Sequence, residues 1–320
     1  EGNFVVIDIG DGKQTIIAEV DYSGAPGTLY PGGIYMIQSQ PYQVERLDWT
    51  GRKAFVRKTR ADYYTDAIDY SRLKILEQFD RSRLGGGDEL AVERSASAHG
   101  EVHLVRRYPG YKKIRYYSHD NIGYGNIDLP DQEMHTTALW WQVHPVVLER
   151  ALPSRERAIE GFLGAAYALH HVAALRAMAE IRDLGRAVGD GQGSWFAVLG
   201  TDGRGQLRGP NNEPLDAVSG GRFEPTLFLY DNYPGGVGLS APLFDAADRL
   251  VRDAIGLVDG CDCSAGCPAC VGPVLAGDEE RARMLNRSLS QTPKQAAMTV
   301  LALLLRERTA GQGPRVGEGS

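Results

Sequence analysis

The sequence is poor in cysteine and shows no export or membrane signal. It holds four cysteines among 320 residues, far fewer than a disulfide-stapled extracellular domain uses. No N-terminal signal pattern is evident, and no apolar run suggests the roughly 20 residues of a membrane-spanning helix. These absences argue against a disulfide-rich chain and predict a cytoplasmic protein with no membrane partner. The first residue is Glu1, so we expect a piece cut from a longer polypeptide.

Basic charge is also scarce overall. The chain has 35 Lys and Arg against 41 Asp and Glu, a formal net charge of −6, which argues against a surface coated for nucleic acid. The charge is uneven, because residues 1–119 hold 17 basic and 16 acidic residues while residues 120–320 hold 18 and 25. An anionic partner is therefore expected to meet the first part. The length suggests two domains, each able to bury a core.

The few cysteines are concentrated within ten residues. In chain order they are Cys261, Cys263, Cys267 and Cys270. Four soft thiolates suit a tetrahedral zinc ion, and a site closed by four protein ligands is structural. Disulfides are one alternative, but the C-x-C pair is poorly spaced to close. An iron–sulfur cluster is another, although the spacing fits neither common ferredoxin pattern. Zinc is the favoured interpretation.

Hydrophobic patterning predicts a β-rich first part. Short β-branched runs separated by glycine, proline or aspartate are typical of strands. The expected strands are 4–7, 15–17, 34–37, 42–44, 54–56, 101–108, 111–118 and 136–143. Gln40-Pro41 and Pro109-Gly110 are interpreted as breaks between strands, and Gly85 opens a glycine-rich loop over 85–88. Residues 71–79 fit a strand or a short helix, since the run is too short for periodicity to decide.

The pattern becomes helical after about residue 150. Ser154 is expected to cap a long helix, and further helices are expected from Ser240 or Pro242 and over 293–306. Residues 226–230 predict a buried strand, and residues 200–222 a long loop. The fold class is α+β. It has a β-rich accessory domain over 1–150, a helical domain over 151–308 with a strand and a four-cysteine zinc knuckle, and a disordered tail over 309–320.

Residues 106–117 mix basic and aromatic side chains. The run RRYPGYKKIRYY holds five basic residues and four tyrosines, the kinds of side chain that contact phosphates and stack on single-stranded DNA bases. The candidate contacts are Arg106, Arg107, Lys112, Lys113 and Arg115 for phosphate, with Tyr116 or Tyr117 for stacking. The alternative is a solvated hairpin whose tyrosines cover a sheet. A second basic run, 52–60, is equally unspecific alone.

Three weaker patterns favour structural roles. The glycine-rich turn over 229–240 can hold phosphate on main-chain N–H groups, but it matches no phosphate-binding motif, so a tight turn is favoured. Asp183 and Asp231 are expected to form capping or core hydrogen bonds. His170 and His171 are neighbours on a helix and face different ways. A loosely spaced set is interpreted as polar loop residues rather than metal ligands: His119, Asp120, Asp131, Glu133 and His135.

Several strings, taken in this order, resemble the C-terminal region of MrfA/YprA-type superfamily 2 (DEAD/DEAH-box) DNA helicases. They are the strings at 29–35, 61–65, 111–117, 129–137, 168–172, 182–185 and 230–238, followed by the four cysteines. The resemblance covers about 30–275, and its later strings belong to the family's zinc-binding MZB domain. It implies that the four cysteines bind a structural zinc and that the parent is an ATP-driven 3′–5′ DNA-unwinding motor of DNA repair.

The motor motifs themselves are not in this sequence. Gly12-Lys13 is followed by Gln14, and Ile7 stands where a Walker A motif needs its first glycine. No DEAH-type acidic box or arginine-finger motif is found either. ATP and Mg²⁺ are therefore expected only in helicase motor domains that lie in cis or on a partner chain. This chain alone is not expected to hydrolyse ATP.

Three functional hypotheses follow. The leading one is the non-motor C-terminal region of an ATP-dependent helicase, which guides single-stranded DNA and is stabilised by structural zinc. The second is a protein-interaction scaffold, such as a non-motor subunit of an anti-phage defence complex. The third and least favoured is an enzyme built around Asp183, Asp231 and the histidines.

Overall fold

The computed structural model describes residues 2–10, 12–85, 95–189, 200–201, 207–208, 225–272 and 291–305. It divides into two compact units, which we call unit 1 (residues 1–71 and 105–133) and unit 2 (residues 72–104 and 134–320). This division differs from the expected boundary near residue 150, because residues 72–104 and 134–150 belong with the helices. The expected tail over 309–320, residues 86–88 of the expected loop and most of 200–222 lie outside the described residues.

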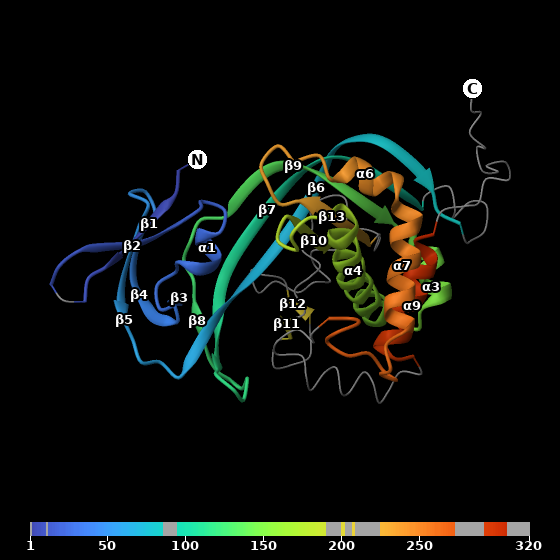
Figure 1. The fold of residues 1–320 in the computed structure, drawn as a ribbon. Coiled ribbons are helices and arrows are strands. Elements are labelled where there is room, and N and C mark those ends of the chain that lie inside the picture. The colour runs from blue at the N-terminus through green and yellow to red at the C-terminus, as the bar shows by residue number, and fades with distance from the viewer. Residues whose placement is uncertain are drawn as a thin grey trace, which may run out of the picture. The chain divides into compact units, whose positions relative to one another are not determined.

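Unit 1 contains a five-stranded sheet in the order β2-β1-β5-β4-β3 (Figure 1). Its elements are β1 (Phe4–Asp8), β2 (Thr15–Val20), the short helix α1 (Ala25–Thr28), β3 (Ile34–Ile37), β4 (Gln40–Asp48) and β5 (Lys53–Lys58). The expected strands of this region are confirmed. The break expected at Gln40-Pro41 is wrong, because both residues start β4, where a proline is tolerated. The core is formed by buried side chains such as Phe4, Val6 and Val56.

A second sheet has the order β10-β13-β9-β7-β6, with β8 paired to β7. Its strands are β6 (Tyr63–Arg83), β7 (Ala96–Arg115), β8 (Asn121–Asn126), β9 (Gln132–Gln142), β10 (Leu184–Gly189) and β13 (Thr226–Asp231). Residues 71–79 are therefore strand. The break expected at Pro109-Gly110 is wrong, because β7 continues through it. Gly110 allows β8 to approach closely, since a Cβ there would lie 2.6 Å from the carbonyl oxygen of Gly125.

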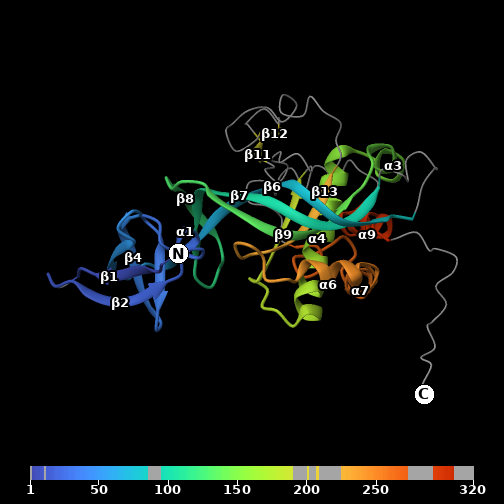
Figure 2. The same cartoon turned by 90° about the horizontal axis from the view of Figure 1, so that it is seen from above.

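The helices of unit 2 cover one face of this sheet. They are α3 (Pro145–Ala151), α4 (Arg155–Ala177), α6 (Ser240–Asp245), α7 (Ala247–Asp259) and α9 (Pro293–Leu303), and two-residue strands β11 (Gly200–Thr201) and β12 (Leu207–Arg208) complete the elements. Figure 2 shows α6 and α7 on one side of β9. Alternate residues of the strands, such as Leu139, Trp141 and Leu229, pack with these helices in the largest core cluster. The predicted α+β fold class is confirmed.

The long helix α4 forms the centre of unit 2. Ser154 caps it as predicted, because its hydroxyl accepts from the Arg157 N–H at 3.2 Å. Residues 157–177 are long and apolar enough to cross a membrane by length and composition alone, so the expectation that no such run exists is wrong. In this structure 72% of the most apolar 18-residue stretch of this helix is buried inside the protein. Gly161 and Gly164 admit α9, since a Cβ on Gly161 would lie 2.8 Å from the Ala296 carbonyl oxygen.

Candidate metal centre and basic surface

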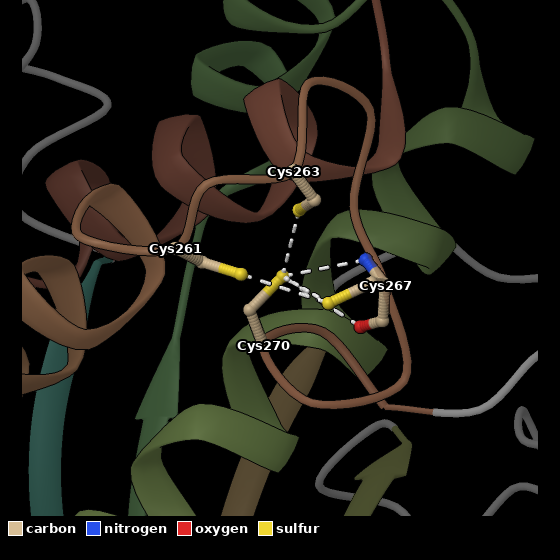
Figure 3. Close-up of side chains that lie close together, drawn as sticks. All are labelled: Cys261, Cys263, Cys267 and Cys270. Carbon is tan, nitrogen blue, oxygen red and sulfur yellow. Dashed lines mark hydrogen bonds between the residues drawn. The ribbon is translucent and has the colours of Figure 1, made fainter.

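The four cysteines lie in the loop that follows α7, and their sulfurs point toward one another (Figure 3). The Sγ atoms of Cys261 and Cys267 are 3.6 Å apart, those of Cys263 and Cys270 3.5 Å, and those of Cys267 and Cys270 3.7 Å. All four ligand atoms lie within 4.8 Å of one another. Tetrahedral zinc with Zn–S bonds of about 2.3 Å separates its sulfurs by about 3.8 Å. The residues therefore fit a single zinc ion.

The same distances weigh against the two alternatives. A disulfide needs sulfurs about 2.05 Å apart, and the four cysteines are free thiols. A cluster of several irons needs its cysteine sulfurs spread around an inorganic core, whereas these four surround the space of one ion. Among the described residues, these cysteines are the one group of three or more side chains placed to hold a metal.

Local geometry prepares the thiols for metal binding. Gly266 has φ +109°, which only glycine adopts readily. The main-chain N–H groups of Ala269 and Cys270 hydrogen-bond to the Cys267 sulfur and lower its pKa to about 7, which favours the thiolate that binds metal. Burial raises the pKa of Cys270 to about 12. A buried Cys270 thiolate therefore needs a cation beside it.

One contact to this loop comes from a residue that no sequence pattern singles out. Lys294, in the first turn of α9, donates its main-chain N–H to the Ala265 carbonyl at 2.9 Å. It lies within the capping box formed by Thr292 and Gln295, which is the nearest signal in the sequence. The box predicts where α9 begins but not what the helix contacts.

The glycine-rich turn after β13 holds a carboxylate of its own chain. Asp231 is fully buried, and its Oδ2 accepts from the main-chain N–H groups of Val237 at 2.7 Å, Gly238 at 2.9 Å and Leu239 at 3.1 Å. The hydroxyl of Thr137 donates to the same oxygen at 3.3 Å. These N–H groups are therefore already paired, which favours the tight turn over a phosphate site.

The other polar candidates lie apart from one another. Asp183 accepts from the Glu180 N–H at 2.9 Å and the Tyr233 hydroxyl at 2.7 Å, and the bond from Tyr233 holds its pKa below the usual value. Asp131 pairs with Arg107, and His135 with Glu101. The structure therefore does not bring together the loosely spaced histidine and acidic set.

His170 is buried and electrically neutral. Its Nε2 lies 2.8 Å from the Leu184 carbonyl oxygen, and its Nδ1 lies 2.8 Å from the Arg186 guanidinium. This arrangement fits the tautomer with Nε2–H donating and Nδ1 accepting. Burial lowers the pKa of His170 to about 4.

The neutral His170 predicts a pH dependence of stability. An unfolded imidazole binds its proton below a pKa of about 6.5, whereas the folded one stays neutral down to about 4. Stability is therefore fully present above pH 6.5 and is lost as the pH falls toward 4, by about 3 kcal/mol in total. In urea titrations at decreasing pH, the free energy of unfolding of the wild type is expected to fall by about 3 kcal/mol more than that of His170→Gln. His119→Gln, at an exposed position, should behave as wild type; equal losses in wild type and His170→Gln would contradict the prediction.

The basic and aromatic candidates of residues 106–117 fall into two groups. Arg115 is 52% exposed, with its Nε 3.7 Å from the exposed carboxylate of Asp62, and Tyr117 is 99% exposed in the turn between β7 and β8, at φ +67°. Lys113 is partly exposed, with its Nζ 5.6 Å from the Tyr63 ring. Lys112 is partly buried, and its charge lowers the pKa of Asp66 against the larger raising effect of burial. These four side chains line β7 beyond Gly110 or the turn that follows it.

The remaining candidates are engaged within unit 1. Arg107 forms a two-point ion pair with Asp131, at 2.8 and 2.7 Å. Arg106 donates to Ser71 at 3.3 Å and lies 3.7 Å from Asp69.

The ring of Tyr116 packs against Tyr64, with centroids 5.7 Å apart. Two other tyrosines of the run, Tyr108 and Tyr111, are buried in a cluster with Tyr30. The tyrosines therefore cover the sheet in part, as the alternative interpretation expects.

Comparisons with known proteins agree with these features. Residues 165–271, which include the four cysteines, match the family described as "MrfA Zn-binding domain". The chain is 31% identical over 284 residues to the ATP-dependent helicase YprA of Bacillus subtilis, covering 88% of this chain and 33% of that protein. It is 24% identical over 276 residues to the ATP-dependent helicase HRQ1 of Saccharomyces cerevisiae, covering 85% of this chain and 23% of that protein.

Solved structures give the same result. The crystal structure of the DUF1998 helicase MrfA bound to DNA aligns with a TM-score of 0.54 and 28% identity, covering 90% of this chain and 33% of that one. A second crystal structure of MrfA, whose description names no DNA, aligns with a TM-score of 0.52 and 25% sequence identity. The predicted resemblance is confirmed. The chain spans about a third or less of the length of the curated relatives it matches.

Proposed function

We propose that this chain, whose residues 165–271 match a zinc-binding domain of MrfA-type helicases, is the non-motor C-terminal region of an ATP-dependent 3′–5′ DNA helicase of DNA repair. The observation that carries the proposal is similarity over about nine-tenths of the chain to a helicase crystallised with DNA. In this proposal the motor domains, with ATP and Mg²⁺, lie elsewhere in the parent or on a partner chain. A cytoplasmic location stays a prediction.

The metal has a structural role in this proposal. Cys261, Cys263, Cys267 and Cys270 supply four protein ligands, which leave zinc no open position for a substrate or water. Zinc would supply only the bonds that close the loop between α7 and α9. The chain's own residues do the rest, because α7 and α9 both pack on α4 in the core of unit 2.

Single-stranded DNA is guided by unit 1 in this proposal. Arg115 and Lys113 supply positive charge to phosphates, and Tyr117 supplies an exposed ring for stacking on a base. The positive φ of Tyr117 places its backbone in a tight turn, where the ring is 99% exposed and open to a base. Arg106 and Arg107 contribute less because their side chains are only 17% and 30% exposed, against 52% for Arg115.

A salt titration tests the DNA surface. Binding of a labelled single-stranded oligonucleotide to the whole chain is expected to weaken as salt rises, since phosphate contacts release counterions. Arg115→Ala should reduce the slope of log Kd against log salt by about 0.7. Tyr117→Ala should weaken binding about 5- to 150-fold, the usual effect of losing one stacked base.

The matched control is Arg182→Ala, an exposed arginine of unit 2, which should leave both quantities unchanged. Absence of salt-dependent binding by the wild-type chain would contradict DNA guiding. That outcome would favour the scaffold hypothesis, in which the basic side chains meet a partner protein.

A further inference from the structure

Lys294 reaches from α9 back to the main chain of the cysteine loop. Its Nζ donates to the carbonyl oxygens of Cys261 at 2.6 Å and Cys263 at 3.1 Å, and lies 3.5 Å from that of Asp259. Within the described part of the chain, no carboxylate forms an ion pair with this ammonium. Its positive charge is thus held by the backbone that carries two of the four cysteines.

The charge of a filled site explains why an ammonium belongs there. Four thiolates outweigh the two positive charges of a zinc ion, so the filled site is an anion. A nearby cation lowers the energy of that anion, and hydrogen bonds to the ligand-bearing backbone fix the directions of the sulfurs. Groups that support metal ligands in this way commonly change metal affinity by 10- to 100-fold.

We propose that Lys294 is a positioning residue through which zinc binding and the docking of α9 stabilise each other. The inference rests on the proposed zinc site and adds to it a residue that is not a ligand. With zinc bound, the ammonium is attracted to the site and holds the first turn of α9 against the loop. Without zinc, the attraction is lost and only hydrogen bonds to carbonyls remain.

The packing around Lys294 links the loop to the core. A Cβ on Gly266 would lie 3.1 Å from the Lys294 main-chain nitrogen, so loop and helix are in close contact. Further along α9, Ala296 and Val300 pack against Gly161 of α4. A shift of the first turn of α9 is therefore transmitted to the central helix of unit 2.

Reciprocal measurements on the whole chain test the proposal. Lys294→Met is expected to weaken zinc binding about tenfold in competition with a coloured chelator. By linkage, the extra stability that zinc gives in urea unfolding should fall by about 1.4 kcal/mol, the free-energy equivalent of a tenfold change in affinity. With zinc removed by a chelator, wild type and variant should unfold at similar urea concentrations. Lys294→Arg, which keeps the charge, should stay within about threefold of wild type.

Two further variants make the result decisive. Lys294→Gln keeps N–H donors without charge, and its zinc affinity should lie between those of Lys294→Met and Lys294→Arg. It also replaces Lys294→Met in the test if that variant does not fold. Lys74→Met, at an exposed position of β6, should match wild type. Unchanged zinc affinity in both neutral Lys294 variants, or an equal loss of stability with and without zinc, would overturn the role of Lys294. A wild-type chain that binds no zinc would instead contradict the metal site itself.

Discussion

Replacing Cys270 by serine is expected to abolish zinc binding and to lower the free energy of unfolding by about 4 kcal/mol or more. Cys270 is 2% exposed, and its sulfur lies near those of Cys263 and Cys267. Serine removes the soft thiolate and leaves three ligands, while the three remaining, partly buried sulfurs lose their cation. Metal analysis and urea unfolding of the purified chain measure the two effects.

A chelator and a neighbouring substitution provide the controls. Chelation of the wild-type chain should reproduce the instability of Cys270→Ser, because both remove the metal. Ser264→Ala, at an exposed position of the same loop, should keep zinc and stability. A chelated wild type as stable as the zinc-loaded chain would contradict a structural role for the metal. Iron in place of zinc in the metal analysis would contradict the choice of ion.

Replacing Asp231 by alanine is expected to destabilise unit 2 by about 3 kcal/mol or more. The substitution removes a fully buried carboxylate that accepts from the N–H groups of Val237, Gly238 and Leu239, and hydrogen bonds to a charged group contribute about 1.5–3 kcal/mol each. Thermal and urea unfolding measure the loss. Asp231→Asn keeps one acceptor oxygen and should lose less.

Asp183→Ala is the matched control for Asp231→Ala. Its carboxylate also caps a turn, but the bonds lie at the surface, where water replaces them, so a much smaller loss is expected. Wild-type stability of Asp231→Ala would contradict the structural role of Asp231. Nuclease activity lost in that variant alone, at unchanged stability, would instead support the least favoured hypothesis, an enzyme.

Local signals predicted the features that depend on local chemistry. Spacing alone brought Cys261 to Cys270 together, since ten residues of loop confine four sulfurs to a small volume. The cap at Ser154 and the all-buried strand β13 were equally readable, because each is determined by its own side chains.

Features that depend on distant partners could not be predicted. Pro109-Gly110 looks like a turn until β8 is placed beside it. Arg107 looks available to phosphate until Asp131 pairs with it. Lys294 carries no pattern, because its partners are main-chain carbonyls of a loop far earlier in the chain.

The two long strands β6 and β7 have a consequence for dividing the protein into pieces. Each contributes residues to both units, so the polypeptide leaves unit 1 after residue 71 and returns to it at residue 105. Cutting at either crossing severs unit 1 from part of itself: a fragment ending at 71 lacks Tyr108 and Tyr111, which bury Tyr30. Neither unit is encoded by one uninterrupted stretch of the sequence. Insertions and fusions are therefore better placed in exposed turns, such as the one at Thr50 and Gly51, than at the boundary between the units.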